Sequence, residues 1–403
     1  MDTNIDTYLQ GVPEMGALGV SANCLLTRDS LRELGGEWAA LFDRSGCEDV
    51  FLSHGWMSEW WDHWGGSNQL YVVTVRESGG RLLAVAPFYI EQPRVAWSAR
   101  VLSFIGTKGV ASDHLDVLVE PGFEQATIPA IVGAVLADRG RWDYIELADA
   151  EAGSSTFKLL CDQFTQAGLR EHLTERPIRP YAELPANFDD YLMGLASAVR
   201  YNFRRRVRNL QRLGAVQFVC LRDYNEILAR FPDLVRLHGL RFDHRKEYSA
   251  FLAPVAQTFH ASLLGGRALR SWPRLFLLQV GVQTVAALYG FSIGKRFSFY
   301  QSGMDPAWAK SSVGLVLLGF CIQHMISSGH RQFDFLRGTP TYKLQWAKCG
   351  RPAVTARFFD HRLKGRLVLT RLQLRDWASR VKRGLRRALA GLYRGNSPAI
   401  STL

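Results

Sequence analysis

The chain has 403 residues, of which 47% are hydrophobic and 21% are charged. Such a composition, with 11 Trp and 23 Phe, is that of a globular protein and excludes a disordered or low-complexity chain. The length exceeds what one domain usually needs and suits two domains of roughly 150–200 residues each.

Several further classes of protein are excluded by what the sequence lacks. No run of about 18 or more apolar residues marks a transmembrane helix. The polar, mildly acidic segment from Met1 to Gln10 lacks the basic-then-apolar pattern of a signal peptide, so we expect a cytoplasmic protein. The six cysteines form no CxxC pair and the ten histidines no HExxH motif, so we expect buried free thiols and no metal site.

The net charge of +12 is concentrated at the end of the chain. Eleven Lys/Arg and one acid lie between His361 and Leu403, which gives +10, so the preceding 360 residues carry only +2. Any contact with an anionic surface is therefore expected in this tail, because the body is close to neutral.

The first half of the chain mixes helical and strand patterns. In chain order these predict helices at 30–44 and 54–64, a hairpin from LYVVTV to RLLAVAPFYI, strands at 100–106 and 112–119, a helix at 124–138, the strand WDYIELAD, a helix through FKLLCDQFTQAG and a closing strand. The spacing of the four Trp in HGWMSEWWDHW favours core packing of that helix.

The second half repeats this order. The patterns predict a basic helix at about 189–213, a helical stretch at 225–260, a hairpin from LFLLQV to TVAALYGFSI, the strand RFSFYQSG, a polar loop at 304–312, the helix VGLVLLGFCIQHMISSG, the strand QFDFLRG and the strand AVTARFFD. The repetition predicts an α/β protein with mixed sheets and two similar domains in tandem. One large α+β domain is the alternative.

Four motifs carry a resemblance to a known family: FLSHGWMSEWW, AVAPFYI, SDHLDVLV and, most specific, FDFLRGTPTYKLQWA. Over about residues 30–360 the chain resembles the CelD/BcsL-type GNAT-like acyltransferases, which are relatives of the FemAB-type aminoacyl-transferring enzymes. The resemblance implies two fused GNAT-like folds, with the acyl-transfer site in the second. The sequence departs from the family where a Pro-Gly pair commonly opens a helix, because Ser312-Val313-Gly314 stands there.

The resemblance also implies a division of the chain. We expect an N-terminal segment at 1–29, a first GNAT-like domain at 30–185, a second, catalytic GNAT-like domain at 186–360 and a basic amphipathic helical tail at 361–403. The tail could pack on the body, lie on an anionic membrane or bind an acidic carrier protein or RNA, and its charge favours a peripheral membrane or partner contact.

Acyl transfer needs an activated carbonyl and donors that stabilise the oxyanion formed from it. A GNAT-like domain supplies these where two parallel strands splay apart and a helix N-terminus follows the first of them. Here the strands would be RFSFYQSG and QFDFLRG. The expected donor-binding residues are Tyr300, Ser302, Ser311, Ser312, Gly314 and Trp346. Ser311 or Ser312 could instead be an ordinary helix cap.

The segment from Asp334 to Trp346 supplies the candidate catalytic residues. In FemAB-type relatives a lysine in the matching segment lies in the active site, and the resemblance carries this role to Lys343. Lys343 could neutralise a phosphate or a developing oxyanion, and the alternative is a solvated surface lysine. Tyr342 could donate a proton or stack on the donor, and could equally be a core aromatic. Alternation places Asp334 opposite its neighbouring phenylalanines, where it could accept an amine proton or fix Arg337. A purely structural ion pair of Asp334 with Arg337 or Lys343 is the alternative.

Two further groups of residues are candidates for binding. Asp113 and His114 open a predicted strand, where they could bind the acceptor at the domain interface or serve a structural turn. The arginine-rich run from Arg200 to Arg208 circles a helix, and could bind phosphates or form a solvated face.

The expected activity is transfer of an acyl group to an amine or hydroxyl of a small molecule or polysaccharide precursor. Coenzyme A or an acyl carrier protein would present the acyl group as a thioester co-substrate, and we expect no tightly bound cofactor. Aminoacyl transfer from a charged tRNA is the alternative within the family, although no coiled-coil insertion is visible. A non-catalytic protein tethered by its basic tail is the alternative from another class.

Overall fold

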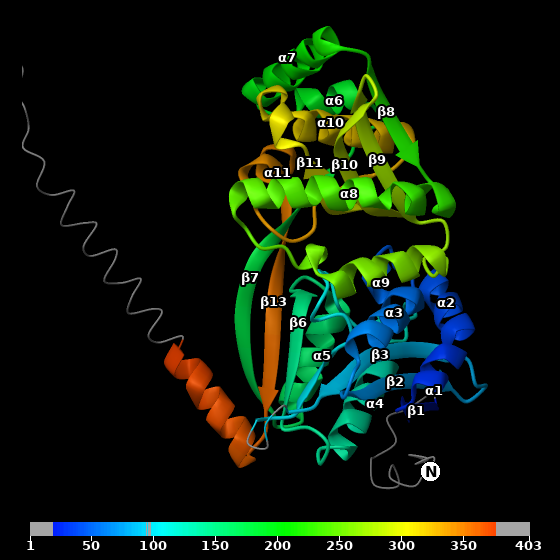
Figure 1. The fold of residues 1–403 in the computed structure, drawn as a ribbon. Coiled ribbons are helices and arrows are strands. Elements are labelled where there is room, and N and C mark those ends of the chain that lie inside the picture. The colour runs from blue at the N-terminus through cyan, green and yellow to red at the C-terminus, as the bar shows by residue number, and fades with distance from the viewer. Residues whose placement is uncertain (1–18, 94, 96–97, 376–403) are drawn as a thin grey trace, which may run out of the picture.

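The computed structural model describes residues 19–93, 95 and 98–375 (Figure 1). Strands of both halves join in one sheet of thirteen strands, in the order β1-β2-β3-β4-β6-β13-β7-β12-β11-β10-β9-β8, with β5 beside β3. Their bounds are β1 Val20–Leu25, β2 Gln69–Glu77, β3 Leu82–Glu91, β4 Val101–Phe104, β5 Leu118–Val119, β6 Tyr144–Glu151, β7 Arg170–Glu183, β8 Val216–Leu221, β9 Pro273–Val280, β10 Gln283–Ile293, β11 Arg296–Met304, β12 Gln332–Asp334 and β13 Cys349–Phe359.

The two ends of this sheet repeat one topology. A run of antiparallel strands, β1-β2-β3-β4 or β8-β9-β10-β11, ends in each half at a parallel pair, β4 with β6 and β11 with β12. A parallel pair needs a crossover, and an apolar helix supplies it in each half: α4 (Glu124–Ala137) and α10 (Val313–Ser327). The predicted repetition of element order is therefore confirmed as a repetition of topology.

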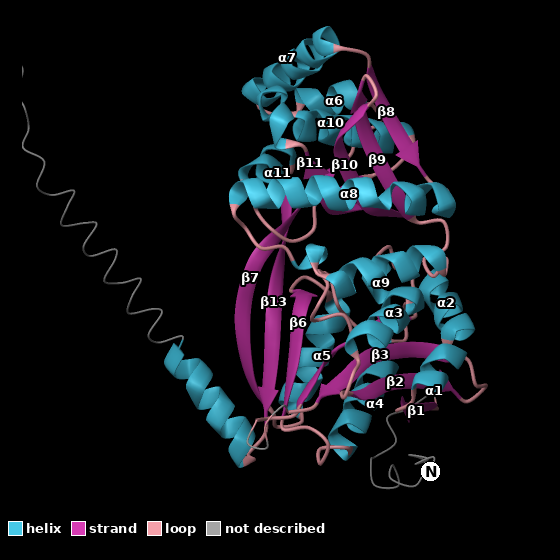
Figure 2. Ribbon diagram, in the orientation of Figure 1, coloured by secondary structure: helices cyan, strands magenta, loops and turns pink. Residues whose placement is uncertain are grey.

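The final strand of each half crosses into the other. β7 is the last strand of the first half in sequence, but its end pairs with β12 of the second half. β13 is the last strand of the second half, and it lies between β6 and β7. Figure 2 shows these long strands running side by side from the lower half to the upper one. Each half thus completes the sheet of the other.

The remaining helices cover the sheet and link the halves. They are α1 (Arg28–Glu33), α2 (Gly35–Arg44), α3 (His54–Trp64), α5 (Ser155–Gln166), α6 (Phe188–Met193), α7 (Ser197–Leu213), α8 (Tyr224–Arg245), α9 (Pro254–Gly265) and α11 (Thr341–Trp346). Within the described part of the chain, no helix has the length and hydropathy to cross a membrane.

Aromatic side chains from both halves share one core. Trp56 of α3 is fully buried, and its ring centroid lies 5.0 Å from that of Phe259 on α9 and 5.6 Å from that of Tyr300 on β11. Trp60 is also buried, while Trp61 and Trp64 pack against the same core from its margin. The predicted packing role of this tryptophan helix is confirmed.

Several predicted elements are wrong in extent. The helix predicted at 30–44 is two helices, α1 and α2, and the strand predicted over QFDFLRG ends at Asp334. The basic helix at 189–213 is two helices, α6 and α7, and the stretch at 225–260 is interrupted between α8 and α9, where Pro254 occupies the first turn of α9. The strand predicted at 112–119 is reduced to the two residues of β5, because the side chains of Asp113 and His114 are held by ion pairs in irregular backbone and His114 has φ 54°.

The described part of the tail is helical over residues 363–375, and the rest of the predicted tail, 376–403, lies outside the described residues. One side of this helix packs on the body through Leu369, which is 6% exposed. The opposite side carries three leucines on one face, and they are 73%, 60% and 61% exposed: Leu363, Leu367 and Leu374. Between Arg362 and Arg375 there are five basic residues and no acid.

We expect Gly303→Ala to destabilise the fold by about 2 kcal/mol, because α8 lies directly on β11 at this residue. An added Cβ would lie 2.2 Å from the backbone nitrogen of His238 and 2.4 Å from the carbonyl carbon of Leu237. Denaturant unfolding measures the change. Gly133→Ala in α4 is the control, since a Cβ there meets nothing within 4 Å. Equal stability of the two variants would contradict this packing.

Candidate active site

The parallel strands β11 and β12 diverge beside the centre of the second half. They are paired over three residues only, from Arg296 opposite Gln332 to Ser298 opposite Asp334, and β11 then continues to Met304 paired with β10 but not with β12. The register against β10 also shifts: Gly290 faces Phe299 and Tyr289 faces Gln301, which leaves Tyr300 as an extra, bulged residue. The expected splayed pair of strands is present.

The N-terminus of α10 follows β11 after a short 3₁₀ turn, η4 (Pro306–Ser311). Ser312 occupies the cap position with φ 52°, and its side chain makes no capping hydrogen bond. The first N–H groups of a helix have no partners within it, so an uncapped N-terminus can bind an anion.

A cavity of about 220 Å³ lies between these two features. Its floor is apolar and comes mainly from β10 and α10, and its polar residues come from α8, the end of β11, the start of α10 and α11. The lining residues are Arg241, Arg245, Ala287, Leu288, Phe299, Ser302, Gly303, Met304, Ala309, Ser312, Gly314, Leu315, Leu317, Leu318 and Tyr342.

Two arginines of α8 contribute the positive charge of this cavity. The Arg241 guanidinium donates to Ser302 Oγ at 3.0 Å and lies 5.7 Å from the centre of the Tyr342 ring. Arg245 lines the cavity one helical turn further, 3.9 Å from Glu247. The sequence analysis identified neither arginine. The helix α8 lies about a hundred residues before the motif FDFLRGTPTYKLQWA, and only the fold brings it to the cavity.

The six expected donor-binding residues do not all lie at one site in the structure. Ser302, Ser312 and Gly314 line the cavity, whereas Ser311 is not among its lining residues. Trp346 is 2% exposed and packs against Tyr191 and Phe203. Tyr300 belongs to the shared aromatic core and lines a different cavity of about 240 Å³ at the junction of the halves.

Lys343 points into the protein. Its Nζ donates to the carbonyl oxygens of Phe335 at 2.6 Å and Arg337 at 2.7 Å, and it lies 5.5 Å from the centre of the Phe299 ring. Burial lowers the pKa of Lys343 to about 8. The ammonium therefore fixes the loop after β12 directly behind the cavity, and its neighbour Tyr342 forms part of the cavity wall.

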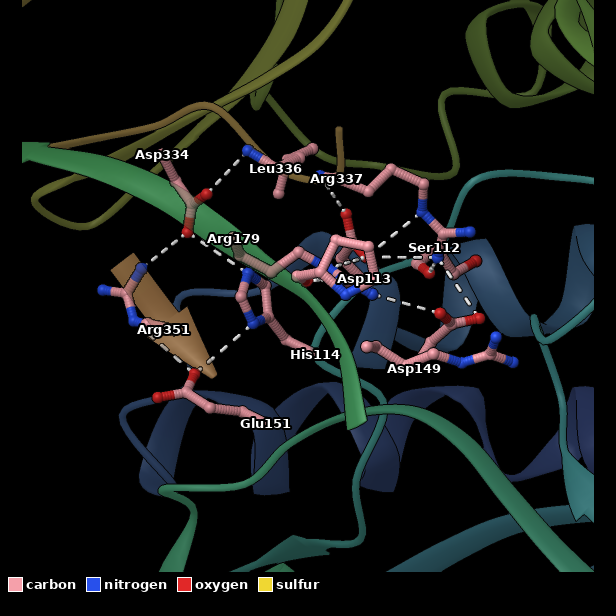
Figure 3. Close-up of polar contacts among 12 residues, drawn as sticks. Ser112, Asp113, His114, Asp149, Glu151, Arg179, Asp334, Leu336, Arg337 and Arg351 are labelled. Carbon is pink, nitrogen blue, oxygen red and sulfur yellow. Dashed lines mark hydrogen bonds and ion pairs between the residues drawn. The ribbon is translucent and has the colours of Figure 1, made fainter. Parts of the chain in front are cut away.

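The other predicted residues meet in a buried ionic cluster at the junction of the halves (Figure 3). Asp113 accepts hydrogen bonds from the Arg179 side chain at 2.6 Å and from the backbone N–H of Arg337 at 2.7 Å. Asp149 lies 3.1 Å from Arg179 and 3.3 Å from Arg337. The negative charges of two carboxylates are thus balanced by the positive charges of two guanidinium groups.

A second set of charges lies beside the first (Figure 3). The Nε2 of His114 is 3.2 Å from Asp334 Oδ2, and its Nδ1 is 3.4 Å from Glu151 Oε2. Arg351 of β13 donates to Asp334 at 2.8 Å. Burial opposes charge on His114, but the carboxylates of Asp49 and Asp334 outweigh it and raise the His114 pKa well above its usual value.

Asp334 remains ionised at the centre of this set. Burial alone would raise its pKa, but His114, Arg351 and the backbone N–H of Leu336 stabilise the carboxylate and lower the pKa to about 2. Its side chain faces away from Phe333 and Phe335, which pack with Phe297 and apolar residues of α10 in a separate hydrophobic cluster, as the predicted alternation required. Asp334 and Arg337 hold separate partners, so the expected contact between them is not formed.

The ionic cluster joins four of the predicted site residues, which come from both halves: Asp113, His114, Asp334 and Arg337. Because these side chains are largely buried and occupied with one another, their arrangement stabilises the junction. Their partners Arg179 and Arg351 were not predicted, since the exchanged strands β7 and β13 carry them. Within the part of the chain that the structure describes, no group of three or more His, Cys, Asp or Glu is arranged to hold a metal ion.

The arginine-rich run lies on α7, at the top of the second half in Figure 1. Arg200 donates to the carbonyl oxygens of Met193 and Leu195, at 2.9 and 2.7 Å. Arg204 lies 3.6 Å from Asp189. No arginine of the run lines the cavity between β11 and α10.

Residues 197–344 match the family model of the acetyltransferase (GNAT) domain. This segment runs from the start of α7 to α11 and contains the cavity, the diverging strands and the uncapped helix. Among proteins of curated function, none matches the sequence.

Three solved structures are similar to the chain. FemX covers 83% of this chain and 98% of its own, with a TM-score of 0.58 and 10% identity. The C-terminal domain of a protein described as a lysylphosphatidylglycerol synthetase, from Agrobacterium fabrum, covers 84% and 96%, with a TM-score of 0.52 and 11% identity. A tandem GNAT protein from the clavulanic acid biosynthesis pathway covers 84% and 98%, with a TM-score of 0.44 and 14% identity.

The likeness to FemX and to the Agrobacterium domain is one of fold, since identities of 10–11% carry no information on substrate. It extends over both halves, as their coverage shows. Together with the match of residues 197–344 to a GNAT domain and the repeated topology of the two halves, this likeness confirms the predicted mixed α/β fold with two GNAT-like halves.

We expect Asp334→Asn to lower the free energy of unfolding by about 3 kcal/mol at pH 7, because the charges of His114 and Arg351 would remain buried without their carboxylate. Since the Asp334 pKa is depressed to about 2, its contribution is present above about pH 4 and is lost as the pH falls toward 2. Denaturant unfolding at pH 7 and pH 3 should show the difference from wild type shrinking on acidification.

Asp162→Asn is the matched control, because Asp162 is exposed on α5. Wild-type stability of Asp334→Asn at pH 7 would show that this carboxylate does not stabilise the junction.

Proposed function

We propose that this protein is an acyltransferase that binds its acyl donor in the cavity between β11 and α10. One observation carries the proposal: an open strand edge, an uncapped helix N-terminus and two arginines converge on one apolar cavity. The match of residues 197–344 to a GNAT domain supports it.

The donor that fits this arrangement is an acyl thioester with an anionic carrier. The N-terminus of α10, with Arg245 nearby, would bind the phosphates of coenzyme A or of a carrier protein's phosphopantetheine group. The apolar residues between β10 and α10 would hold the chain that leads to the thioester. The backbone of β11 beyond Ser298 lacks a β12 partner and would donate hydrogen bonds to the carbonyl oxygen as it gains charge.

Lys343 has an indirect role in this proposal. Its Nζ is bonded to two backbone carbonyl oxygens and lies behind the cavity wall, so it would hold Tyr342 and the diverging end of β12 in place. Tyr342 itself faces the cavity and is the better candidate for contact with the donor. Asp334 and Arg337 would act through the junction of the halves, since the ionic cluster occupies their side chains.

Aminoacyl transfer from a charged tRNA is the second candidate. The fold shared with FemX is compatible with it, and the basic face of α7 would suit a polynucleotide. The thioester is favoured because the cavity itself has phosphate-binding groups and an apolar interior. Within the GNAT-like enzymes, a relation to the CelD/BcsL type rests on the sequence motifs alone.

Arg245→Ala should weaken the binding of acetyl-CoA about tenfold, because a charge-assisted hydrogen bond to a phosphate is worth about 1.5–3 kcal/mol. Titration calorimetry with the full chain measures it. Arg236→Ala is the control, since Arg236 lies on the same helix and does not line the cavity. No binding of acetyl-CoA by the wild type, together with binding of an aminoacyl-tRNA, would favour the second candidate.

We also propose that the helix at 363–375 docks on an anionic lipid surface. Its three exposed leucines form one face, and the flanking Arg366, Arg371 and Arg375 make no ion pair within the described residues. Exposed leucines bordered by cations are the pattern of a helix that lies in a membrane interface. The protein would then be a cytoplasmic enzyme with a peripheral membrane contact.

The double variant Leu363→Ser/Leu367→Ser should reduce binding to vesicles of phosphatidylcholine and phosphatidylglycerol at least tenfold, since each buried leucine contributes about 1.5 kcal/mol. Vesicle sedimentation at low and high salt measures this. Val282→Ser, at a fully exposed hairpin turn, is the control. Equal binding to uncharged vesicles, or unchanged binding by the double variant, would contradict the lipid contact.

A further inference from the structure

A second cavity, of about 240 Å³, lies at the junction of the halves beside the first. The first half contributes the loop at 109–111, and the second half contributes β11 and the connection between α8 and α9. The lining residues are Gly109, Val110, Ala111, Phe242, Tyr248, Ser249, Ala250, Phe251, Ala256, Tyr300 and Gln301. Four of them are aromatic and none is charged.

The two cavities meet β11 at successive residues. Tyr300 and Gln301 line the cavity at the junction, and Ser302 to Met304 line the proposed donor cavity. On α8, Phe242 lines the cavity at the junction and Arg241 lines the proposed donor cavity. A molecule bound at the junction would therefore approach the donor along the bulged part of β11.

A buried hydrogen-bonded chain connects the two cavities. His238 of α8 is 1% exposed. Its Nδ1 lies 2.9 Å from the carbonyl oxygen of Ser302, and its Nε2 lies 2.8 Å from Ser249 Oγ, which lines the cavity at the junction.

The direction of this chain follows from the chemistry of its members. A carbonyl oxygen can only accept, so Nδ1 of His238 must carry the proton and donate it to Ser302. The unprotonated Nε2 must then accept the hydroxyl hydrogen of Ser249. Burial lowers the pKa of His238 to about 4, which keeps the imidazole neutral and this direction fixed.

His238 is held in place from several sides. Its ring stacks on Phe242 at a centroid distance of 4.4 Å and meets Phe251 edge-on at 5.0 Å. The absence of a side chain at Gly303 lets the backbone of α8 approach β11 at this point. The hydroxyl of Ser249 therefore has one orientation, toward a base whose other nitrogen is already occupied.

We propose that Ser249 and His238 form a proton relay for an uncharged, ring-bearing acceptor bound in the cavity at the junction. This inference rests on the acyltransferase function proposed above. The aromatic lining would bind the ring, and the absence of charged side chains disfavours an ionic acceptor. Ser249 contacts the acceptor directly, and His238 is the base that receives the proton through Ser249.

The hydroxyl or amine of the acceptor attacks the thioester carbonyl and forms the new C–O or C–N bond. Its proton passes to Ser249 Oγ as the Ser249 hydrogen passes to Nε2 of His238. The C–S bond then breaks, and the proton returns through Ser249 to the departing thiolate.

The test compares single variants of the full chain with acetyl-CoA as donor and methyl glucoside as acceptor. Ser249→Ala and His238→Gln should lower kcat about 100-fold or more, with the KM for acetyl-CoA changed less than twofold. Ser249→Thr, which keeps the hydroxyl, should recover activity to within about tenfold of the wild type. Thr258→Ala, which removes an exposed hydroxyl from neighbouring α9, should have no effect. Glucuronate, a charged sugar, should be a poorer acceptor than methyl glucoside.

The outcomes separate this proposal from the one on which it rests. A wild type that binds no acetyl-CoA contradicts the donor cavity. A wild type that transfers the acetyl group while Ser249→Ala keeps its kcat contradicts only the relay, as does a preference for glucuronate. A folded Ser249→Ala variant that still binds acetyl-CoA but has lost turnover supports the relay, even if His238→Gln does not fold.

Discussion

The exchange of the final strands between the two halves is the constraint on which the rest of the structure depends. β13 is hydrogen-bonded on both edges, to β6 and to β7, and the end of β7 in turn pairs with β12. Neither half can therefore close its sheet without a segment of the other. The junction becomes the interior of one sheet, where a flexible linker would otherwise be expected between two domains.

The ionic cluster follows from this arrangement. Arg179 and Arg351 are carried on the exchanged strands, and they meet carboxylates from the loops and strands beside them. Charges buried at this depth are tolerated only when each has a partner, and here cations and carboxylates alternate. The cluster thus fixes the orientation of the two halves relative to each other. It thereby also fixes the position of the loop at 109–111, which faces β11. The two cavities owe their relative position to it.

Much of the secondary structure of the second half could be predicted from the sequence. The hairpin, the strand RFSFYQSG and the apolar helix each have a clear period, and the residues Ser302, Ser312, Gly314 and Tyr342 do meet at one cavity. Strand exchange leaves no trace in local periodicity, because the pattern of a strand such as β7 or β13 does not identify the strands beside it. The roles of Arg179, Arg241 and His238 also depend on contacts between segments far apart in the chain. Asp334 and Lys343 show the opposite case: their motif was recognisable, but burial and bonding direct their side chains to structural partners.

The position of β13 in the sheet has a consequence for how the protein is made. During synthesis the first half emerges early, with β6 lacking the neighbour that residues 349–359 will provide. At typical rates of about 5–20 residues per second, roughly 200 further residues pass before that strand leaves the ribosome. For at least about ten seconds the nascent chain exposes an unpaired strand edge. Unpaired edges invite association with other chains, so production of this protein should depend on a chaperone that shields the edge until the last strand arrives.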